Sequence, residues 1–175
     1  LELPSGTFTL RDGPAGAFFL VNMKQQDSLV ISDDQIPQFQ IVYDAGNIVS
    51  DSVQTGWNIV SLPVRVDDRR KMVVFPTSTS NAFAFTTTGY AIRDTLEYGT
   101  GYWLKFPSTQ VLSLSGEFVA LDTIDVVQGW NIIGSISASV PVGNIIQLPA
   151  GIIASQYFGY SDGGYGPIAI IDPMR

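Results

Sequence analysis

The sequence predicts an all-β protein: two related antiparallel β units, sandwich-like, plus an N-terminal β segment, with very little helix. Three observations support this prediction. The phrase Gly-Trp-Asn-Ile occurs twice, at residues 56–59 and 129–132, and such repetition indicates a repeated structural unit. Seventeen Gly and ten Pro punctuate short runs of β-branched and aromatic residues. No stretch of ten residues keeps the 3.6-residue period of an amphipathic helix.

The composition narrows the classes of function. The chain carries a net charge of −7, which argues against nucleic acid as a partner, because phosphates attract Lys and Arg. It contains no Cys and no His, which excludes disulfides, thiol nucleophiles, Cys/His zinc sites and Ser-His-Asp triads. The low charged fraction, the acidity and the aromatic residues favour a secreted surface protein over a cytosolic enzyme. No run approaches the roughly 20 apolar residues of a membrane-spanning helix.

Residues 1–45 form the N-terminal β segment. Its candidate strands are residues 7–10, 17–21, 28–31 and 39–43, separated by turn residues. Four short strands make one sheet face and not a closed sandwich. The segment is therefore expected to need a partner, either the rest of the chain or another molecule.

Residues 46–110 form the first repeat unit. Its candidate strands are residues 48–53, 57–64, 72–75, 82–86, 89–92 and 101–106. The segment from Thr86 to Tyr90 predicts a hairpin turn. The last strand, Gly-Tyr-Trp-Leu-Lys-Phe, is aromatic and is entered through glycines.

Residues 111–175 form the second unit. Residues 111–114 and 118–121 predict a hairpin around Ser115-Gly116, and residues 140–146 predict a middle part with one short helical turn. Residues 155–160 match residues 81–85 of the first unit. Counted from Trp130, the counterpart of strand 101–106 falls beyond Arg175, so we expect the second unit to lack its closing strand.

A β unit that lacks one strand exposes unpaired backbone groups beside an apolar core, and such an edge can accept a strand from another chain. Forward donation from molecule to molecule gives head-to-tail contacts and a filament. The alternative is a cloning or proteolytic fragment from which the strand was cut. The expected acceptor edge is Ile168, Ile170 and Ile171, and the expected donors are Thr7, Phe8, Thr9 and Leu10, and Phe18, Phe19, Leu20 and Val21.

Aromatic residues are the richest signal for packing and for binding. The expected repeat core, or packing between the repeats, comprises Trp57, Tyr102, Trp103 and Trp130. Exposed aromatic rings can stack on sugars, and a candidate ligand platform in a Gly-rich stretch comprises Tyr157, Tyr160 and Tyr165.

Residues able to carry catalysis or to bind a metal are few. The adjacent pairs Asp33-Asp34 and Asp67-Asp68 lie on predicted loops where neighbouring carboxylates splay apart, which does not suit a glycosidase pair. The nearest candidates for a structural calcium ion are Asp122, Asp125 and Asp162, but no Asp-x-Asp-x-Asp-Gly loop occurs. We therefore expect no catalytic residue, no cofactor and no metal site. The basic trio at 69–71 follows Asp67-Asp68 and predicts a self-neutralised exposed loop.

The motifs resemble those of a known module. They are Gly-Trp-Asn-Ile-Val-Ser-Leu-Pro-Val, Gly101-Tyr-Trp-Leu-Lys and Gly129-Trp-Asn-Ile-Ile-Gly-Ser. The chain from about 47 to 173 resembles a module of large secreted proteins from Bacteroidetes and Ignavibacteria-type bacteria, usually found just before a type IX secretion sorting domain. The resemblance implies secretion and a surface location, and it supplies no catalytic residues. Residues 7–43 resemble the closing strands of the β sandwich that often precedes that module.

These patterns together predict a non-catalytic extracellular structural protein that self-assembles by β-strand complementation, as a filament or surface-layer subunit. Its expected partner is another copy of itself, with no nucleic acid and no membrane span. The expected location is extracellular or at the bacterial cell surface. The alternative is a secreted carbohydrate-binding or adhesion module of a larger cell-surface protein.

Overall fold

The computed structural model describes residues 7–12, 20–26, 28–30, 38–44 and 46–175. Their regular structure is almost entirely antiparallel β, so the predicted fold class is confirmed. Within this part of the chain there is one short helix, α1 (Lys71–Val74), and one 3-10 turn, η1 (Val142–Asn144). No helix of this part is long and apolar enough to cross a bilayer.

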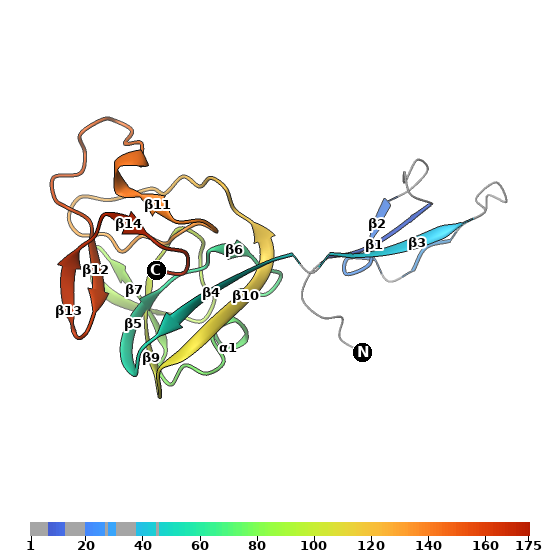
Figure 1. The fold of residues 1–175 in the computed structure, drawn as a ribbon, viewed down its shortest axis with the longest axis horizontal. Coiled ribbons are helices and arrows are strands. Elements are labelled where there is room, and N and C mark those ends of the chain that lie inside the picture. Colours follow the sequence, from blue (N-terminus) through green and yellow to red (C-terminus); the bar gives the residue numbers. More distant parts are fainter. Residues whose placement is uncertain (1–6, 13–19, 27, 31–37, 45) are drawn as a thin grey trace.

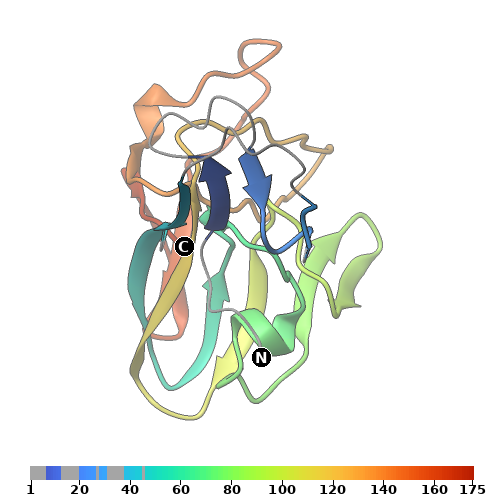
Figure 2. The ribbon, with the colours of Figure 1, turned by 90° about the vertical axis from the view of Figure 1, so that its right-hand side faces the viewer.

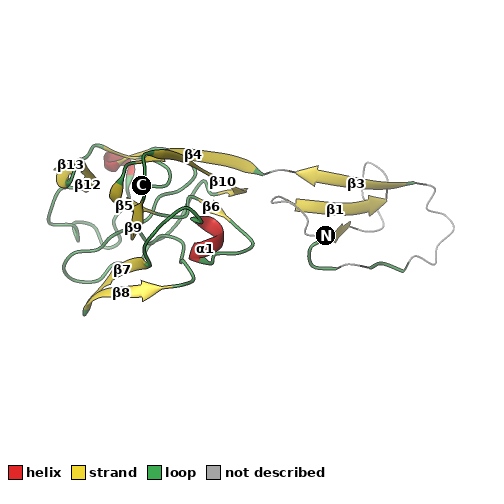
Figure 3. Cartoon of the chain, turned by 90° about the horizontal axis from the view of Figure 1, so that it is seen from below, coloured by secondary structure: helices red, strands yellow, loops and turns green. Residues whose placement is uncertain are grey.

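The N-terminal sheet has three strands in the order β2-β1-β3. They are β1 (Thr7–Asp12), β2 (Leu20–Asn22) and β3 (Phe39–Asp44). Figures 1 and 3 show this sheet set apart from the rest of the protein, with β3 leading into β4, and Figure 2 views it from its own side. The expected strand at 28–31 does not form over residues 28–30, and residues 17–19 and 31 lie outside the described residues.

The first unit is a two-sheet sandwich. One sheet has the order β4-β10-β6, and the other has the order β5-β9-β7-β8. The core between them draws on both sheets and includes Val53, Val60, Val64, Tyr102, Leu104, Phe106, Leu112 and Leu114. The strands are β4 (Asn47–Val53), β5 (Gly56–Val60), β6 (Val64–Arg65), β7 (Ala82–Thr86), β8 (Gly89–Arg93), β9 (Tyr102–Phe106) and β10 (Gln110–Phe118).

Two strand predictions in this region are wrong. Residues 71–74 form α1, whose first residue donates its backbone N–H to Asp94 and accepts from Phe75. The predicted hairpin at 111–121 is instead the single strand β10, which pairs with β4 and then with β6. Gly116 marks a close approach and not a turn, because a Cβ at this position would lie 2.2 Å from the carbonyl oxygen of Arg65. Residues 110–118 therefore belong with the first unit.

The second unit contains less regular structure. It has two small two-stranded sheets and no strand over residues 119–139. Its strands are β11 (Val140–Pro141), β12 (Phe158–Ser161), β13 (Gly164–Pro167) and β14 (Ile170–Ile171). Its last residues return to the first unit, where the side chain of Met174 is fully buried in the core. The second unit thus contributes Met174 to the hydrophobic core of the first.

Of the four aromatic residues expected in the repeat core, Tyr102 lies there with 1% exposure. Trp103 is partly buried and packs between the repeats against Tyr160 and Tyr165, which agrees with the second part of the prediction. The prediction of core burial is wrong for Trp57 and Trp130, which are 43% and 66% exposed. The physical reason is strand alternation: Asn58, Val60, Tyr102 and Leu104 face the core, so Trp57 and Trp103 face the other side of the sheet.

Candidate functional site

The repeated Gly-Trp-Asn phrase forms the same side-chain-to-backbone turn in both units. The Asn58 amide donates to the carbonyl oxygens of Gln54 and Gly56 at 2.8 and 3.1 Å, and its oxygen accepts from the Gln54 N–H at 2.9 Å. Asn131 makes the corresponding three bonds to Val127 and Gly129, at 2.8, 3.1 and 3.0 Å. The preceding glycines have φ values of 96° and 99°, in the left-handed region that favours glycine.

The hairpins of the two units also agree. In β7–β8, Phe85 pairs with Tyr90 and Thr86 with Gly89. In β12–β13, Tyr160 pairs with Tyr165 and Ser161 with Gly164. Both aromatic pairs are edge-to-face, with ring centroids 5.2 and 5.5 Å apart. The sequence similarity therefore reflects a repeated backbone register.

The two units contact each other reciprocally. The Gly134 N–H donates to the carbonyl oxygen of Gly99, and the Ser61 N–H donates to that of Met174, at 2.8 and 3.0 Å. Gly99 and Met174 both have a φ of 72°. Met174 is therefore the structural counterpart of Gly99, although it is not a glycine.

One strand of the first unit, β9, has no counterpart among the described residues of the second unit. In the first unit, β9 lies between β5 and β7 and pairs with both. In the second unit, no strand of the described residues lies between residues 129–133 and β12. We call the space between these two segments the open strand position. The same Gly-Trp-Asn phrase is consequently a strand at 56–60 but not at 129–133.

The aromatic rings that flank the open strand position have nearly the same separation as the rings that flank β9 in the first unit. In the first unit, the rings of Trp57 and Phe83 flank β9 with centroids 6.0 Å apart. In the second unit, the rings of Trp130 and Phe158 lie 5.9 Å apart in a similar edge-to-face arrangement. Phe158 and Trp130 are both exposed. The flanking segments have not closed onto each other.

The backbone of residues 129–133 presents hydrogen-bonding groups to this space. On its other edge, the Ile132 carbonyl oxygen accepts from the Gly101 N–H, and the Gly134 N–H donates to the Gly99 carbonyl oxygen. Thr100 and Ile133 lie opposite each other between these two bonds. Because alternate residues of an antiparallel strand direct their backbone groups to opposite edges, those of Asn131 and Ile133 point towards the open strand position. Among the described residues, the backbone groups of Asn131 and Ile133 form no backbone–backbone hydrogen bond.

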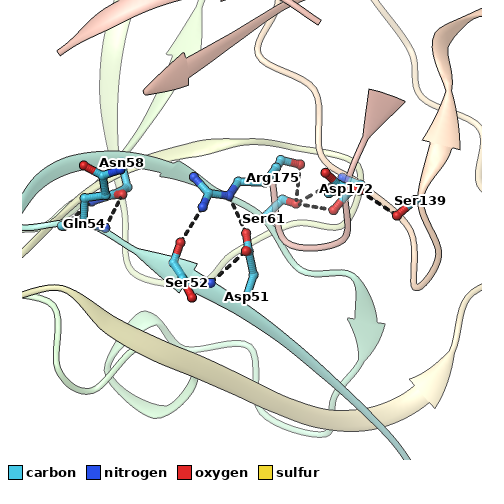
Figure 4. A network of polar contacts seen from close by, with 9 residues as sticks. Asp51, Ser52, Gln54, Asn58, Ser61, Ser139, Asp172 and Arg175 are labelled. Atoms are coloured by element: carbon cyan, nitrogen blue, oxygen red, sulfur yellow. Dashed lines mark hydrogen bonds and ion pairs between the residues drawn. The ribbon is translucent and has the colours of Figure 1, made fainter. Parts of the chain in front are cut away.

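A polar network ties the end of the second unit to the first (Figure 4). Arg175 forms an ion pair with Asp51 and donates to the carbonyl oxygen of Ser52, both on β4. Asp172 accepts from the Ser139 hydroxyl at 2.6 Å. The hydroxyls of Ser61 and Ser135 lie 3.0 Å apart at the buried junction. Together with the bonds of Ser61 to the carbonyl oxygens of Met174 and Arg175, these contacts hold the end of the chain against β4 and the residue that follows β5.

The expected acceptor edge is not the open one. Ile170 and Ile171 form β14, which pairs with β11, and the Ile168 N–H donates to the carbonyl oxygen of Tyr157. The open strand position lies instead beside residues 129–133. The signal that could have located it is Asn131, whose turn shows that residues 129–133 correspond to β5.

The expected donor segments lie in the N-terminal sheet. Thr7, Phe8, Thr9 and Leu10 belong to β1, which pairs on both sides. Leu20 and Val21 belong to β2, which pairs only with β1 within the described residues. Phe18 and Phe19 lie outside the described residues.

The candidate ligand platform is occupied by contacts between the units. Tyr160 and Tyr165 pack edge-on against Trp103 of the first unit, with ring centroids 4.6 and 6.2 Å away. The Tyr157 hydroxyl is buried without a hydrogen-bond partner, and burial raises the pKa of Tyr157. Burial also raises the pKa of Tyr165. Tyr160 and Tyr165 thus join the two units, although Tyr165 keeps an exposed side.

Five acidic residues of the described ranges form ion pairs. Asp68 pairs with Arg70 at 2.5 Å, and hydrogen bonds from Arg70 lower the pKa of Asp68. Asp67 pairs with Lys24, and Arg69 pairs with Glu97. No group of three or more potential metal ligands lies within the described ranges, and Asp33 and Asp34 fall outside them.

Each junction between the units contains a shallow pocket. The larger, of about 320 Å³, lies between the β7–β8 hairpin and residues 124–133, with Thr86, Thr100 and Asp125 among its polar lining residues. The smaller, of about 110 Å³, lies between the β12–β13 hairpin and residues 54–58. A single carboxylate among hydroxyl and amide groups does not make an acid–base pair. The larger pocket lies beside the open strand position.

Comparisons of the chain with protein-family models, curated proteins and solved structures find no match.

Proposed function

We propose that this chain is a non-catalytic structural protein that self-associates, with the second unit accepting a β strand from another copy. The observation that carries the proposal is the open strand position between residues 129–133 and β12, at the place where β9 completes the first unit. Strand addition supplies both backbone hydrogen bonds and apolar contacts, so it can hold extended assemblies together. Head-to-tail repetition of the contact gives a filament or a surface layer.

The sequence offers a donor. Phe18-Phe19-Leu20 repeats the aromatic-aromatic-leucine order of Tyr102-Trp103-Leu104 in β9. Leu20 lies on β2, and removing an edge strand breaks pairing on one side only, whereas donating β1 would break pairing on both sides. We therefore favour the segment around Leu20 over the segment 7–10 as the donor.

An extracellular or cell-surface location is part of this proposal. It is supported by the acidic, Cys-free and weakly charged composition and by the resemblance to secreted bacterial modules. The alternative, a carbohydrate-binding module, draws on the exposed side of Tyr165. Contacts of Tyr160 and Tyr165 with Trp103 favour a role for these rings in joining the units.

Sedimentation velocity and electron microscopy of the full 175-residue chain test the proposal. We expect species that grow with protein concentration. The matched control carries a copy of residues 101–106 fused directly after Arg175, so that the open strand position is filled within the same molecule. The control should remain monomeric. A full chain that stays a folded monomer at all concentrations contradicts the proposal.

A further inference from the structure

We infer that the open strand position recognises a strand with the pattern of β9, which runs antiparallel to residues 129–133. Such a strand has apolar side chains at alternate positions facing inward and an aromatic side chain at the second position facing outward. The inference rests on the proposed function and adds the chemistry of the accepted strand. It follows from the contacts that β9 makes in the first unit and from the residues that correspond to them in the second.

The inward pattern follows from the core. Tyr102, Leu104 and Phe106 of β9 are essentially fully buried beside Val60. Ile133 occupies the place of Val60 in the second unit, and its backbone faces the open strand position. Ile171, which corresponds in sequence to the buried Leu96, is also buried in the second unit. A charged side chain at an inward position of the accepted strand would be desolvated without a partner, which is strongly unfavourable.

The outward aromatic follows from the reciprocal packing of the units. Trp103 lies 6.4 Å from Trp57 of its own unit, and it contacts Tyr160 and Tyr165 on the hairpin of the other unit. The corresponding groups around the open strand position are Trp130, and Phe85 and Tyr90 on the β7–β8 hairpin. Trp130 and Tyr90 are exposed. An outward aromatic on the accepted strand would therefore meet three aromatic rings, as Trp103 does.

The register also follows from the first unit. Tyr102 pairs with Val60, and Phe106 pairs with Gly56. The accepted strand should accordingly place its first inward residue opposite Ile133 and its last opposite Gly129. Since Met174 corresponds to Gly99, Arg175 corresponds to Thr100, and a copy of residues 101–106 fused after Arg175 enters in this register.

Thermal unfolding of fused chains tests the inference. We compare the unfused chain with three fusions: the unchanged copy of residues 101–106, a copy with its tryptophan replaced by alanine, and a copy with its leucine replaced by aspartate. We expect the unchanged copy to raise Tm by roughly 4–8 °C, which corresponds to a stabilisation of about 2 kcal/mol, because each 1 kcal/mol shifts Tm by about 2–4 °C at this chain length. The alanine copy should give less than half of this increase, and the aspartate copy none.

A second background separates specific packing from added hydrophobicity. In the Trp130→Ala variant, the Tm difference between the tryptophan and alanine fusions should shrink, because the tryptophan of the fused copy no longer has the Trp130 ring beside it. In the matched control Trp57→Ala, which alters the same phrase in the first unit, that difference should persist. Equal Tm increases for the tryptophan, alanine and aspartate copies would overturn the inference.

The two proposals can fail separately. If the unfused chain self-associates but the fused copies do not differ in Tm, the inferred strand chemistry is wrong and the proposed function stands. If the fused copies differ as expected but the unfused chain stays monomeric, the strand chemistry stands and self-association is wrong.

Discussion

At the scale of single residues, the asparagine of the repeated phrase explains why the phrase occurs twice. In each unit its side chain closes a turn by binding the backbone four residues earlier. A serine hydroxyl has a single hydrogen to donate and a leucine side chain has none, so neither could make the two donations and one acceptance that the asparagine makes. The tryptophan beside it, which is the more conspicuous residue in the sequence, lies on the exposed face.

The two asparagines should differ in their effect on stability. Asn58 is 4% exposed and its bonds to Gln54 and Gly56 are part-buried, so Asn58→Ala leaves these backbone groups unpaired where water reaches them poorly, at a cost of about 1–3 kcal/mol. Asn131→Ala should cost less, because the bonds of Asn131 to Val127 and Gly129 are exposed and water can replace them. Urea unfolding of both variants measures the difference. Equal losses for the two variants would argue against the difference between an occupied and an open strand position.

Tyr102 should make stability depend on pH at the alkaline end. Burial raises the pKa of Tyr102, and a hydrogen bond from the Glu97 N–H, 2.7 Å from the hydroxyl oxygen, partly offsets this rise. An unfolded tyrosine ionises near pH 10, so above about pH 10 the unfolded state loses its proton first and the free energy of unfolding falls. The stabilisation from neutral Tyr102 is thus present below about pH 10 and is lost as pH rises through its folded pKa.

Tyr102→Phe separates the two contributions of this hydroxyl. At neutral pH the variant should lose about 1–2 kcal/mol, because the Glu97 N–H loses its acceptor. Above about pH 10 its stability should fall less steeply than that of the parent chain. Denaturant unfolding at several pH values measures both effects. A variant with an unchanged alkaline slope would show that Tyr102 does not carry this dependence.

At the scale of elements, the two copies show that a strand needs a partner. Residues 56–60 and 129–133 share sequence and turn geometry, yet only the first segment is a strand, because only it has β9 beside it. The preceding segments show the same contrast. Val53 of β4 is 1% exposed, whereas Val126 is 41% exposed and lies outside any strand. Backbone pairing, more than local propensity, decides these elements.

The sequence allowed the fold class and several strands to be predicted, since alternation and turn residues are local signals. The hairpins at Thr86–Tyr90 and at Gly164-Tyr165 are examples. The nature of Gly116 could not be predicted, because its close approach to Arg65 depends on a strand distant in sequence. Counting from Trp130 predicted that the second unit holds no counterpart of β9 up to residue 175, but the edge that lacks a partner was not predictable, because β14 pairs with β11 across residues 142–169.

At the scale of the whole molecule, the two units depend on each other. The β12–β13 hairpin of the second unit covers Trp103 of the first, and Met174 completes the first unit's core. The β7–β8 hairpin of the first unit is placed to do the same for a strand in the second. The protein therefore combines one complete sandwich with one open strand position, which is the physical basis of the proposed self-association.

Hydrogen exchange of the backbone amides tests whether this strand position is open, when it is measured on the dilute 175-residue chain and on the chain with residues 101–106 fused after Arg175. We predict that the amides of residues 129–133 exchange much faster than those of 56–60 in the unfused chain, and that the fusion slows them towards the rates of 56–60. Slow exchange of residues 129–133 in dilute unfused chain, unchanged by the fusion, would contradict the claim that this strand position is open.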